Sequence, residues 1–200
     1  MISARKNNIQ AGLLVKIPEF LKFRLQSPER EPARMLYAAA AAQGRSPALF
    51  SDLGAPDTVE GRFEMVSTHV YLILRRLRSF QTPPTRKLAQ AVLDVFMEDL
   101  DDSLRELGVG DMSIARKIRK MAENFYGRIG AFEDALKPDA DANALASAIA
   151  LNVFETSDGT KGEALATYMR RAESVIAEQT QADLLAGIVT FAPITLDNAQ

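Results

Sequence analysis

Cysteine and tryptophan are absent from this 200-residue sequence, and histidine occurs once, at position 69. Without cysteine, disulfide bonds and thiolate metal sites are excluded, so the composition is compatible with a reducing compartment. A single histidine removes most hydrolytic and metal-dependent schemes, because proton transfer by His69 would need a carboxylate that nothing in the sequence places within reach. No cofactor is therefore expected.

Long apolar runs and an excess charge of one sign are also missing. No run approaches the roughly 20 residues of a membrane-spanning helix, and Met1 to Leu25 lack the compact apolar core of a secretory signal. The net charge of −2 gives no reason to expect a nucleic-acid partner. With 47% hydrophobic residues, the chain fits one domain with a real core, with or without arms.

The first segment, residues 1–30, is a basic arm with apolar residues on one side of a short helix that Pro18 interrupts. The favoured interpretation is an arm packed on the domain. The alternative is a membrane-surface arm held by apolar contact and anionic lipid. A removed targeting peptide is a third interpretation, and we give it the least weight.

Helical periodicity dominates the rest of the chain, most clearly from Thr85 to Leu136. Two long helices are expected there, joined by the turn Gly108-Val109-Gly110-Asp111, with Asp111 or Ser113 capping the second helix. Acids crowd the end of the first helix and bases the start of the second. An antiparallel hairpin would bring them face to face, with at most ~1 kcal/mol for each exposed pair.

Four further helices surround this hairpin in the predicted fold. They are expected at Arg34–Gln43, from Asp57 or Thr58 to about Pro83, from about Ala142 to Phe154, and around Leu165–Ile176, with a loop from Arg45 to Pro56. The fold class is therefore all-α: a single-domain, irregular bundle of roughly six helices around a central antiparallel hairpin. The domain spans residues 31–180. Residues 181–200 form a tail that packs back, the one segment with weak strand alternation.

The sequence offers no catalytic or metal-binding constellation. The acids Asp94, Glu98, Asp101 and Asp102 lack the Glu-x-x-His pattern of a di-iron bundle and the ligand alternation of a calcium loop, so a solvated or partner-binding face is favoured. His69 is expected at a helix edge, bonded to a neighbour rather than catalytic. The chain is not expected to be an enzyme, and its function is expected to come from its surfaces.

Several motifs resemble the ubiquinol–cytochrome c chaperone family, in one order along residues 37–136. These are the segment from Gly54 to Met65 followed by His69 and Leu74-Arg75-Arg76-Leu77, the segments Asp94–Asp101 and Leu104–Asp111, and Phe125-Tyr126-Gly127-Arg128. The upstream element Arg45–Phe50 is also similar, although Ser51 stands where the family tends to carry tyrosine. The first thirty or so residues and the tail after Pro138 lie outside the resemblance.

The resemblance implies an assembly factor for the respiratory cytochrome bc1 complex that binds newly made cytochrome b. Its implied partners are cytochrome b or another bc1 assembly component, a second assembly factor, and a membrane surface. It also implies a cytoplasmic location or the inner face of a membrane, which is the matrix side if the source is eukaryotic.

We hypothesise that the partner surface combines the Arg62–Arg76 helix with the Glu98–Asp111 end of the hairpin. The candidate residues are Arg62, Glu64, His69, Arg75, Arg76, Glu98, Asp101, Arg105, Asp111, Tyr126 and Arg128. Each has a structural alternative: Asp111 as a helix cap, and Arg76 as the partner of a hairpin acid.

Two other classes of function stay open. A helical small-ligand-binding protein predicts a deep polar pocket at His69 in which Arg62 and Glu64 converge. A peripheral membrane module predicts that deleting Met1 to Leu25 abolishes vesicle binding while the domain stays folded.

Overall fold

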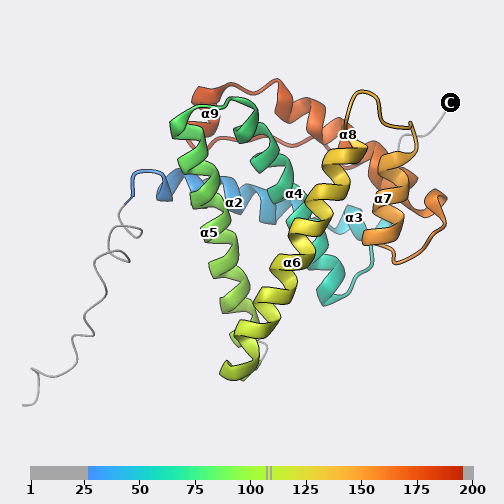
Figure 1. Cartoon of the computed structure of the whole chain (residues 1–200), viewed down its shortest axis with the longest axis horizontal. Helices are drawn as coiled ribbons and strands as arrows, with labels where there is room; N and C mark the ends of the chain where they lie inside the picture. Colours follow the sequence, from blue (N-terminus) through green and yellow to red (C-terminus); the bar gives the residue numbers. More distant parts are fainter. Residues whose placement is uncertain (1–26, 107, 109, 196–200) are drawn as a thin grey trace, which may run out of the picture.

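The computed structural model describes residues 27–106, 108 and 110–195, and its regular elements are all helical (Figure 1). The elements are α2 (Arg30–Gly44), α3 (Pro47–Ser51), α4 (Val59–Ser79), α5 (Pro83–Glu106), α6 (Asp111–Ala135), α7 (Ala144–Asn152), the 3-10 turn η1 (Gly159–Gly162), α8 (Glu163–Ala177) and α9 (Gln181–Leu185). The described residues contain no strand, so the predicted all-α class is confirmed. The basic arm lies largely outside the described residues.

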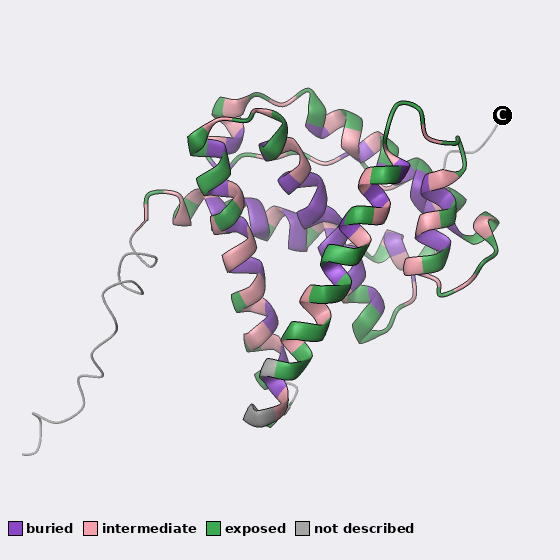
Figure 2. Ribbon diagram, in the orientation of Figure 1, coloured by how far each residue is buried: buried purple, intermediate pink, exposed green. Residues whose placement is uncertain are grey.

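Helix α4 runs through the middle of the bundle and is buried around most of its circumference (Figure 2). Its start is fixed by Thr58, whose hydroxyl accepts a hydrogen bond from the Gly61 amide at 3.0 Å. Helices α2, α5 and α8 pack around it. Even the polar side chains Glu64 and Tyr71 are buried here, although an amphipathic helix would place them in solvent.

Helices α5 and α6 converge at the turn around Gly108 and diverge toward their other ends (Figure 1). Gly108 adopts a φ of +74°, the left-handed conformation that glycine tolerates at a helix end. The N-cap of α6 is Gly110, so the expected cap by Asp111 or Ser113 is wrong. Leu100, Leu104 and Ile114 form a small core near this turn, separate from the main one.

The expected charge pairing across the two helices is wrong for three acids of α5. Glu98 pairs with Arg30 at 2.7 Å, Asp99 with Arg45 at 3.4 Å, and Asp101 with Arg105 one turn along the same helix. Glu98 and Asp99 thus connect α5 to the two ends of α2, whereas Asp101 stabilises α5 itself. The reason is that α2 crosses α5 and offers its arginines at shorter range.

The segment from Arg45 to Pro56, expected to be a loop, contains the short helix α3. Ser46 is extended and Pro47 occupies the first helical turn, where its missing N–H costs nothing. Leu49 in α3 and Leu53 just after it are buried. This turn of helix holds Phe50 beside the start of α4.

The chain returns to the first helix after α8. Thr180 and Asp183 form a reciprocal capping box at the start of α9. Residues 186–195 then run back over the bundle, with Arg171 donating to the carbonyls of Pro193 and Thr195 and Gln43 to that of Ala192. Within the part of the chain that is described, no helix is both long and apolar enough to cross a membrane.

Candidate functional site

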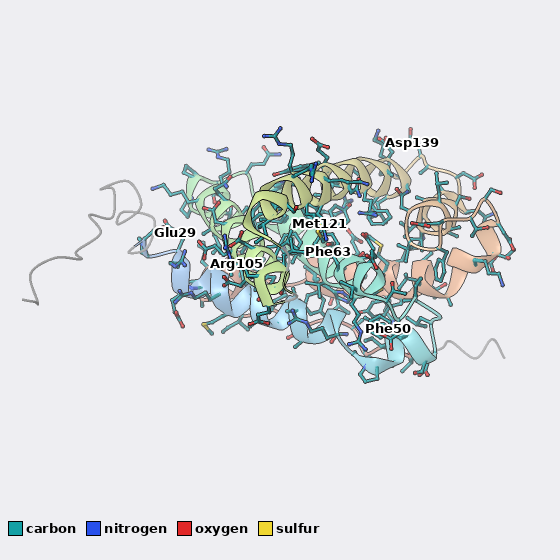
Figure 3. All side chains as sticks on the ribbon, turned by 90° about the horizontal axis from the view of Figure 1, so that it is seen from below. Glu29, Phe50, Phe63, Arg105, Met121 and Asp139 are labelled. Carbon is teal, nitrogen blue, oxygen red and sulfur yellow. The ribbon has the colours of Figure 1, made fainter. Side chains whose placement is uncertain are left out.

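A partly apolar groove of about 190 Å³ lies where α2, α4, α5 and α6 meet. We call this set of residues the groove: Tyr37, Arg45, Val59, Arg62, Phe63, Val66, Phe96, Asp99, Leu100, Ser103, Leu104 and Met121. Its floor is apolar because Phe63 and Met121 pack against the small core near the α5–α6 turn (Figure 3). Val59 at its edge is 57% exposed, so the groove presents apolar surface to solvent.

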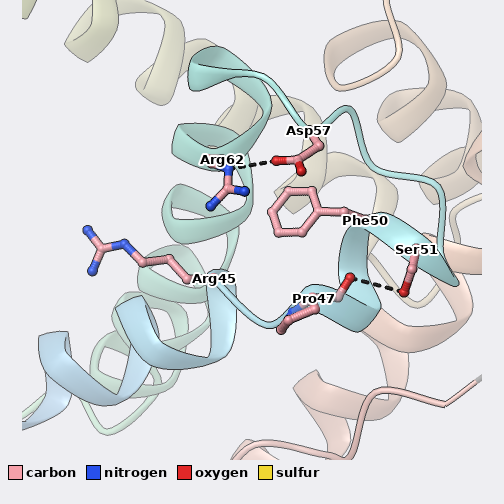
Figure 4. Close-up of a pocket in the computed structure, with 6 residues that line it drawn as sticks. All are labelled: Arg45, Pro47, Phe50, Ser51, Asp57 and Arg62. Carbon is pink, nitrogen blue, oxygen red and sulfur yellow. Dashed lines mark hydrogen bonds and ion pairs between the residues drawn. The ribbon is translucent and has the colours of Figure 1, made fainter. Parts of the chain in front are cut away.

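A second hollow of about 400 Å³ adjoins the groove and shares Arg45 and Arg62 with it. It lies between α3 and the start of α4 (Figure 4). Arg62 donates to the Asp57 carboxylate at 2.6 Å, and its guanidinium carbon lies 5.3 Å from the centre of the Phe50 ring. The two contacts orient Arg62 while leaving about half of its side chain exposed.

The other shared arginine, Arg45, belongs to a short polar network at the end of α2. Its guanidinium lies 3.4 Å from the Asp99 carboxylate, which also accepts a hydrogen bond from the Tyr37 hydroxyl. Burial, together with this hydrogen bond to a carboxylate, raises the pKa of Tyr37 well above its ordinary value. Tyr37 therefore stays protonated and serves as a donor that fixes Asp99.

The groove and its neighbour offer apolar surface next to positive charge. The apolar floor suits an apolar side chain or helix face, and two half-exposed arginines suit carboxylates or free carbonyls at a helix end. No group of three or more potential metal ligands occurs among the residues described.

His69 was expected at a helix edge, but it is fully buried. One ring nitrogen lies 2.6 Å from the Met65 carbonyl oxygen, so it carries the proton and donates. The other accepts from the Tyr168 hydroxyl at 2.7 Å, and that hydroxyl accepts from the Gln43 side chain at 2.9 Å. Burial lowers the pKa of His69 to about 4, which keeps the ring neutral. The expectation that it bonds to neighbours is confirmed.

Glu64 and Arg128 form a buried ion pair at 2.8 Å between α4 and α6. Burial raises the pKa of Glu64 to about 7, and the positive charge of Arg128 opposes this shift. Arg128 also donates to the Asn152 carbonyl, which ties α6 to α7. Arg62, Glu64 and His69 thus engage three different sets of partners and do not converge on one pocket.

The arginines near the end of α4 face α6 and α8. Arg75 pairs with Glu133 and, at 3.4 Å, with Glu173. Arg76 donates to the Gln179 carbonyl and lies over the Phe80 ring, with 4.2 Å from guanidinium carbon to ring centre. The predicted pairing of Arg76 with a hairpin acid is therefore wrong, since its guanidinium binds the Gln179 carbonyl in the segment after α8.

The remaining predicted residues are scattered. Glu98, Asp101 and Arg105 lie on α5, each in an ion pair, and Tyr126 is exposed on α6. Asp111 is the first residue of α6. Of the predicted candidates, only Arg62 lines the groove. As contacts with a partner, all the predicted candidates remain hypotheses.

Several groove residues were not singled out from the sequence as site residues, namely Tyr37, Arg45, Val59, Phe96, Asp99 and Met121. A signal existed for four of them, because Arg45, Val59, Phe96 and Asp99 lie in segments that resemble the family pattern. The groove residues come from four helices, however, so only tertiary structure shows that they share a surface.

The fold and the groove define an all-α protein with an open, partly apolar surface groove edged by arginines. This arrangement is typical of proteins that bind a segment of another protein. A family model described as ubiquinol–cytochrome c chaperone matches residues 51–191. The chain belongs to this family, as the motifs in the sequence had indicated.

Relatives with known roles support the same family. The chain is 24% identical over 154 residues to ubiquinol-cytochrome-c reductase complex assembly factor 1 of Xenopus laevis, covering 76% of each protein. It is 28% identical over 149 residues to the mouse protein of the same name, covering 72% of the chain and 49% of that relative. The chain thus matches about half of the mouse protein's length.

A solved structure confirms the fold. The crystal structure of the Cbp3 homolog from Brucella abortus superposes with a TM-score of 0.74 at 32% sequence identity. The match covers 88% of this chain and 97% of the Brucella chain.

Proposed function

We propose that this protein is a non-enzymatic assembly chaperone of the respiratory cytochrome bc1 complex, and that it binds immature cytochrome b through the groove. Membership of the chaperone family supports the first part, together with relatives named as assembly factors of ubiquinol–cytochrome c reductase. The observation that carries the second part is the groove itself, with apolar surface open to solvent between two half-exposed arginines.

The mechanism is binding that favours one state of the client. An immature membrane protein exposes helix ends and apolar faces that later contacts cover. Val59, Phe63 and Met121 would contact such a face, while Arg45 and Arg62 would hold carboxylates or the free carbonyls of a helix end. Because only the immature client offers these groups, binding raises the population of that state, and mature contacts then compete it away. The protein would work at the face of the membrane where the client's ends emerge.

A pull-down from native membranes tests this function with a matched pair of variants. Val59→Glu places a charge in the groove, and Leu151→Glu places the same charge on an equally exposed apolar position of α7. We expect cytochrome b recovery to fall at least tenfold with Val59→Glu and to be unchanged with Leu151→Glu. Circular dichroism checks that both variants fold.

Two outcomes contradict different parts of the proposal. Equal recovery by both variants would remove the groove as the binding surface while keeping the function. Absence of cytochrome b from the parent pull-down would reject the function itself.

A further inference from the structure

The outer face of α6 carries a group of bases without partners in the described part of the chain. Arg116, Lys117, Arg119 and Lys120 are all exposed and make no ion pair or side-chain hydrogen bond with another described residue. The like charges of Arg116 and Lys120 stand one turn apart and repel each other. Within the described residues, Glu123, the exposed acid that follows them on this face, makes no ion pair with them, so the face keeps an excess of positive charge.

The same face continues with features that also favour an external contact. Tyr126 is 51% exposed, a large ring left in solvent. Gly127 and Gly130 follow, and a Cβ atom built on either would meet nothing within 4 Å. A glycine inside a helix costs roughly 0.5–1 kcal/mol relative to alanine, and here no close packing within the chain requires it.

The charges and dimensions of the face indicate its partner. Four bases within five residues select carboxylates, and from Arg116 to Gly130 the helix rises about 21 Å, the length of about 15 helical residues. The exposed acids Asp102 and Glu106 end the neighbouring helix α5. They would repel a broad phosphate surface, whereas a single helix lying along α6 need not cover them.

We propose that the outer face of α6 binds a helix of a partner protein that carries a group of carboxylates at one end. The carboxylates pair with the bases Arg116–Lys120, and the remainder of the helix lies on Tyr126 and the open positions after it. This surface is separate from the groove, to which α6 contributes Met121 from its inner side. A client in the groove and a partner on α6 can therefore be held together, whichever client fills the groove.

Photo-crosslinking from the face itself tests the proposal. The full chain, tagged and carrying p-benzoyl-phenylalanine in place of Tyr126, is illuminated in native membranes, and the crosslinked peptide is sequenced. We expect a peptide from a different protein, with at least three Asp or Glu residues within about 15 helical positions. Arg116→Glu with Lys120→Glu should lower the yield at least tenfold. The control Lys87→Glu with Lys161→Glu makes the same charge change at exposed positions elsewhere and should leave the yield unchanged.

A second variant separates binding from folding. Gly127→Gln adds bulk to an open helix position, so it should raise the melting temperature while lowering the crosslink yield at least fivefold. A role in folding alone would not lower the yield.

Five results would overturn the proposal. They are crosslinks only to lipid, crosslinks only to a second copy of this chain, a captured peptide without acidic residues, a yield that the charge reversal leaves intact, and no crosslink in the parent.

Discussion

At the scale of single residues, α4 buries two ionisable side chains with opposite effects on folding stability. His69 has its pKa lowered to about 4, so the unfolded state binds more protons and stability falls as pH drops from 6.5 toward 4. Glu64 has its pKa raised to about 7, so the folded state binds more protons and stability falls as pH rises from 4.5 toward 7. Over the shared window the two effects partly cancel.

Replacing one of the two side chains leaves only the other's effect on the pH dependence of stability. For Glu64→Gln we expect the free energy of unfolding, relative to the parent, to rise by up to about 3 kcal/mol between pH 4.5 and pH 7.5. The unpaired Arg128 adds a constant cost, because arginine does not titrate in this range. Urea denaturation at four pH values measures the difference. Glu60→Gln, on the exposed first turn of α4, should show no such slope, and a flat difference for Glu64→Gln would contradict the prediction.

At the scale of elements, two glycines within helices have opposite roles. A Cβ atom on Gly61 would lie 1.9 Å from the Pro56 carbonyl oxygen, because the chain entering α4 packs against the helix there. A Cβ atom on Gly130 in α6 would meet nothing within 4 Å. Gly61 permits close packing, whereas Gly130 makes its helix less stable than alanine would and permits no close contact within the chain.

Alanine substitution distinguishes these roles. Gly61→Ala should lower the free energy of unfolding by about 2 kcal/mol or more, since backbone must move. Gly130→Ala should raise it by about 0.5–1 kcal/mol. Chemical denaturation measures both, and a loss of stability in Gly130→Ala would show that α6 needs its glycine for contacts within the chain.

The helices also show what the sequence could and could not predict. Apolar spacing and breakers located the six longer helices, and the start of α4 was expected at Asp57 or Thr58 because capping patterns are local; Thr58 is the residue that caps it. The burial of Glu64, His69 and Tyr71 was not expected, because periodicity assumes one solvated face and the middle of α4, from Glu64 to Leu74, has none. Helix α3 was missed because five residues are too few for a periodic signal.

At the scale of the whole molecule, the groove could not be predicted for a related reason. Tyr37, Val59, Phe96 and Met121 lie far apart in the sequence, and only the packing of four helices brings them together. The resemblance to a chaperone family supplied the class of function. It did not supply the surface, since the candidate residues drawn from its motifs mostly form internal ion pairs and hydrogen bonds.

The segment after α9 contributes to the stability of the whole fold through a few side chains. Phe191 is half-buried, with its ring 5.1 Å from that of His69 in an edge-on arrangement, whereas Ile188 in the same segment is 53% exposed. We expect Phe191→Ala to lower the free energy of unfolding by about 2–3 kcal/mol and Ile188→Ala to change it by less than about 0.5 kcal/mol. Similar values for both variants in urea would mean that this segment does not help to close the core.

Gln43 of α2 is bonded to the Tyr168 hydroxyl and to the Ala192 carbonyl, partners 125 and 149 positions further along the chain. During synthesis from the N-terminus, the bond to Tyr168 must wait until residue 168 has left the ribosome, and the bond to Ala192 and the contact of Phe191 with His69 must wait for residues 191 and 192. Helices α2 and α4 are thus made early but reach their final contacts only after residue 192 has been translated. Until then, the polar core of the bundle stays open to water.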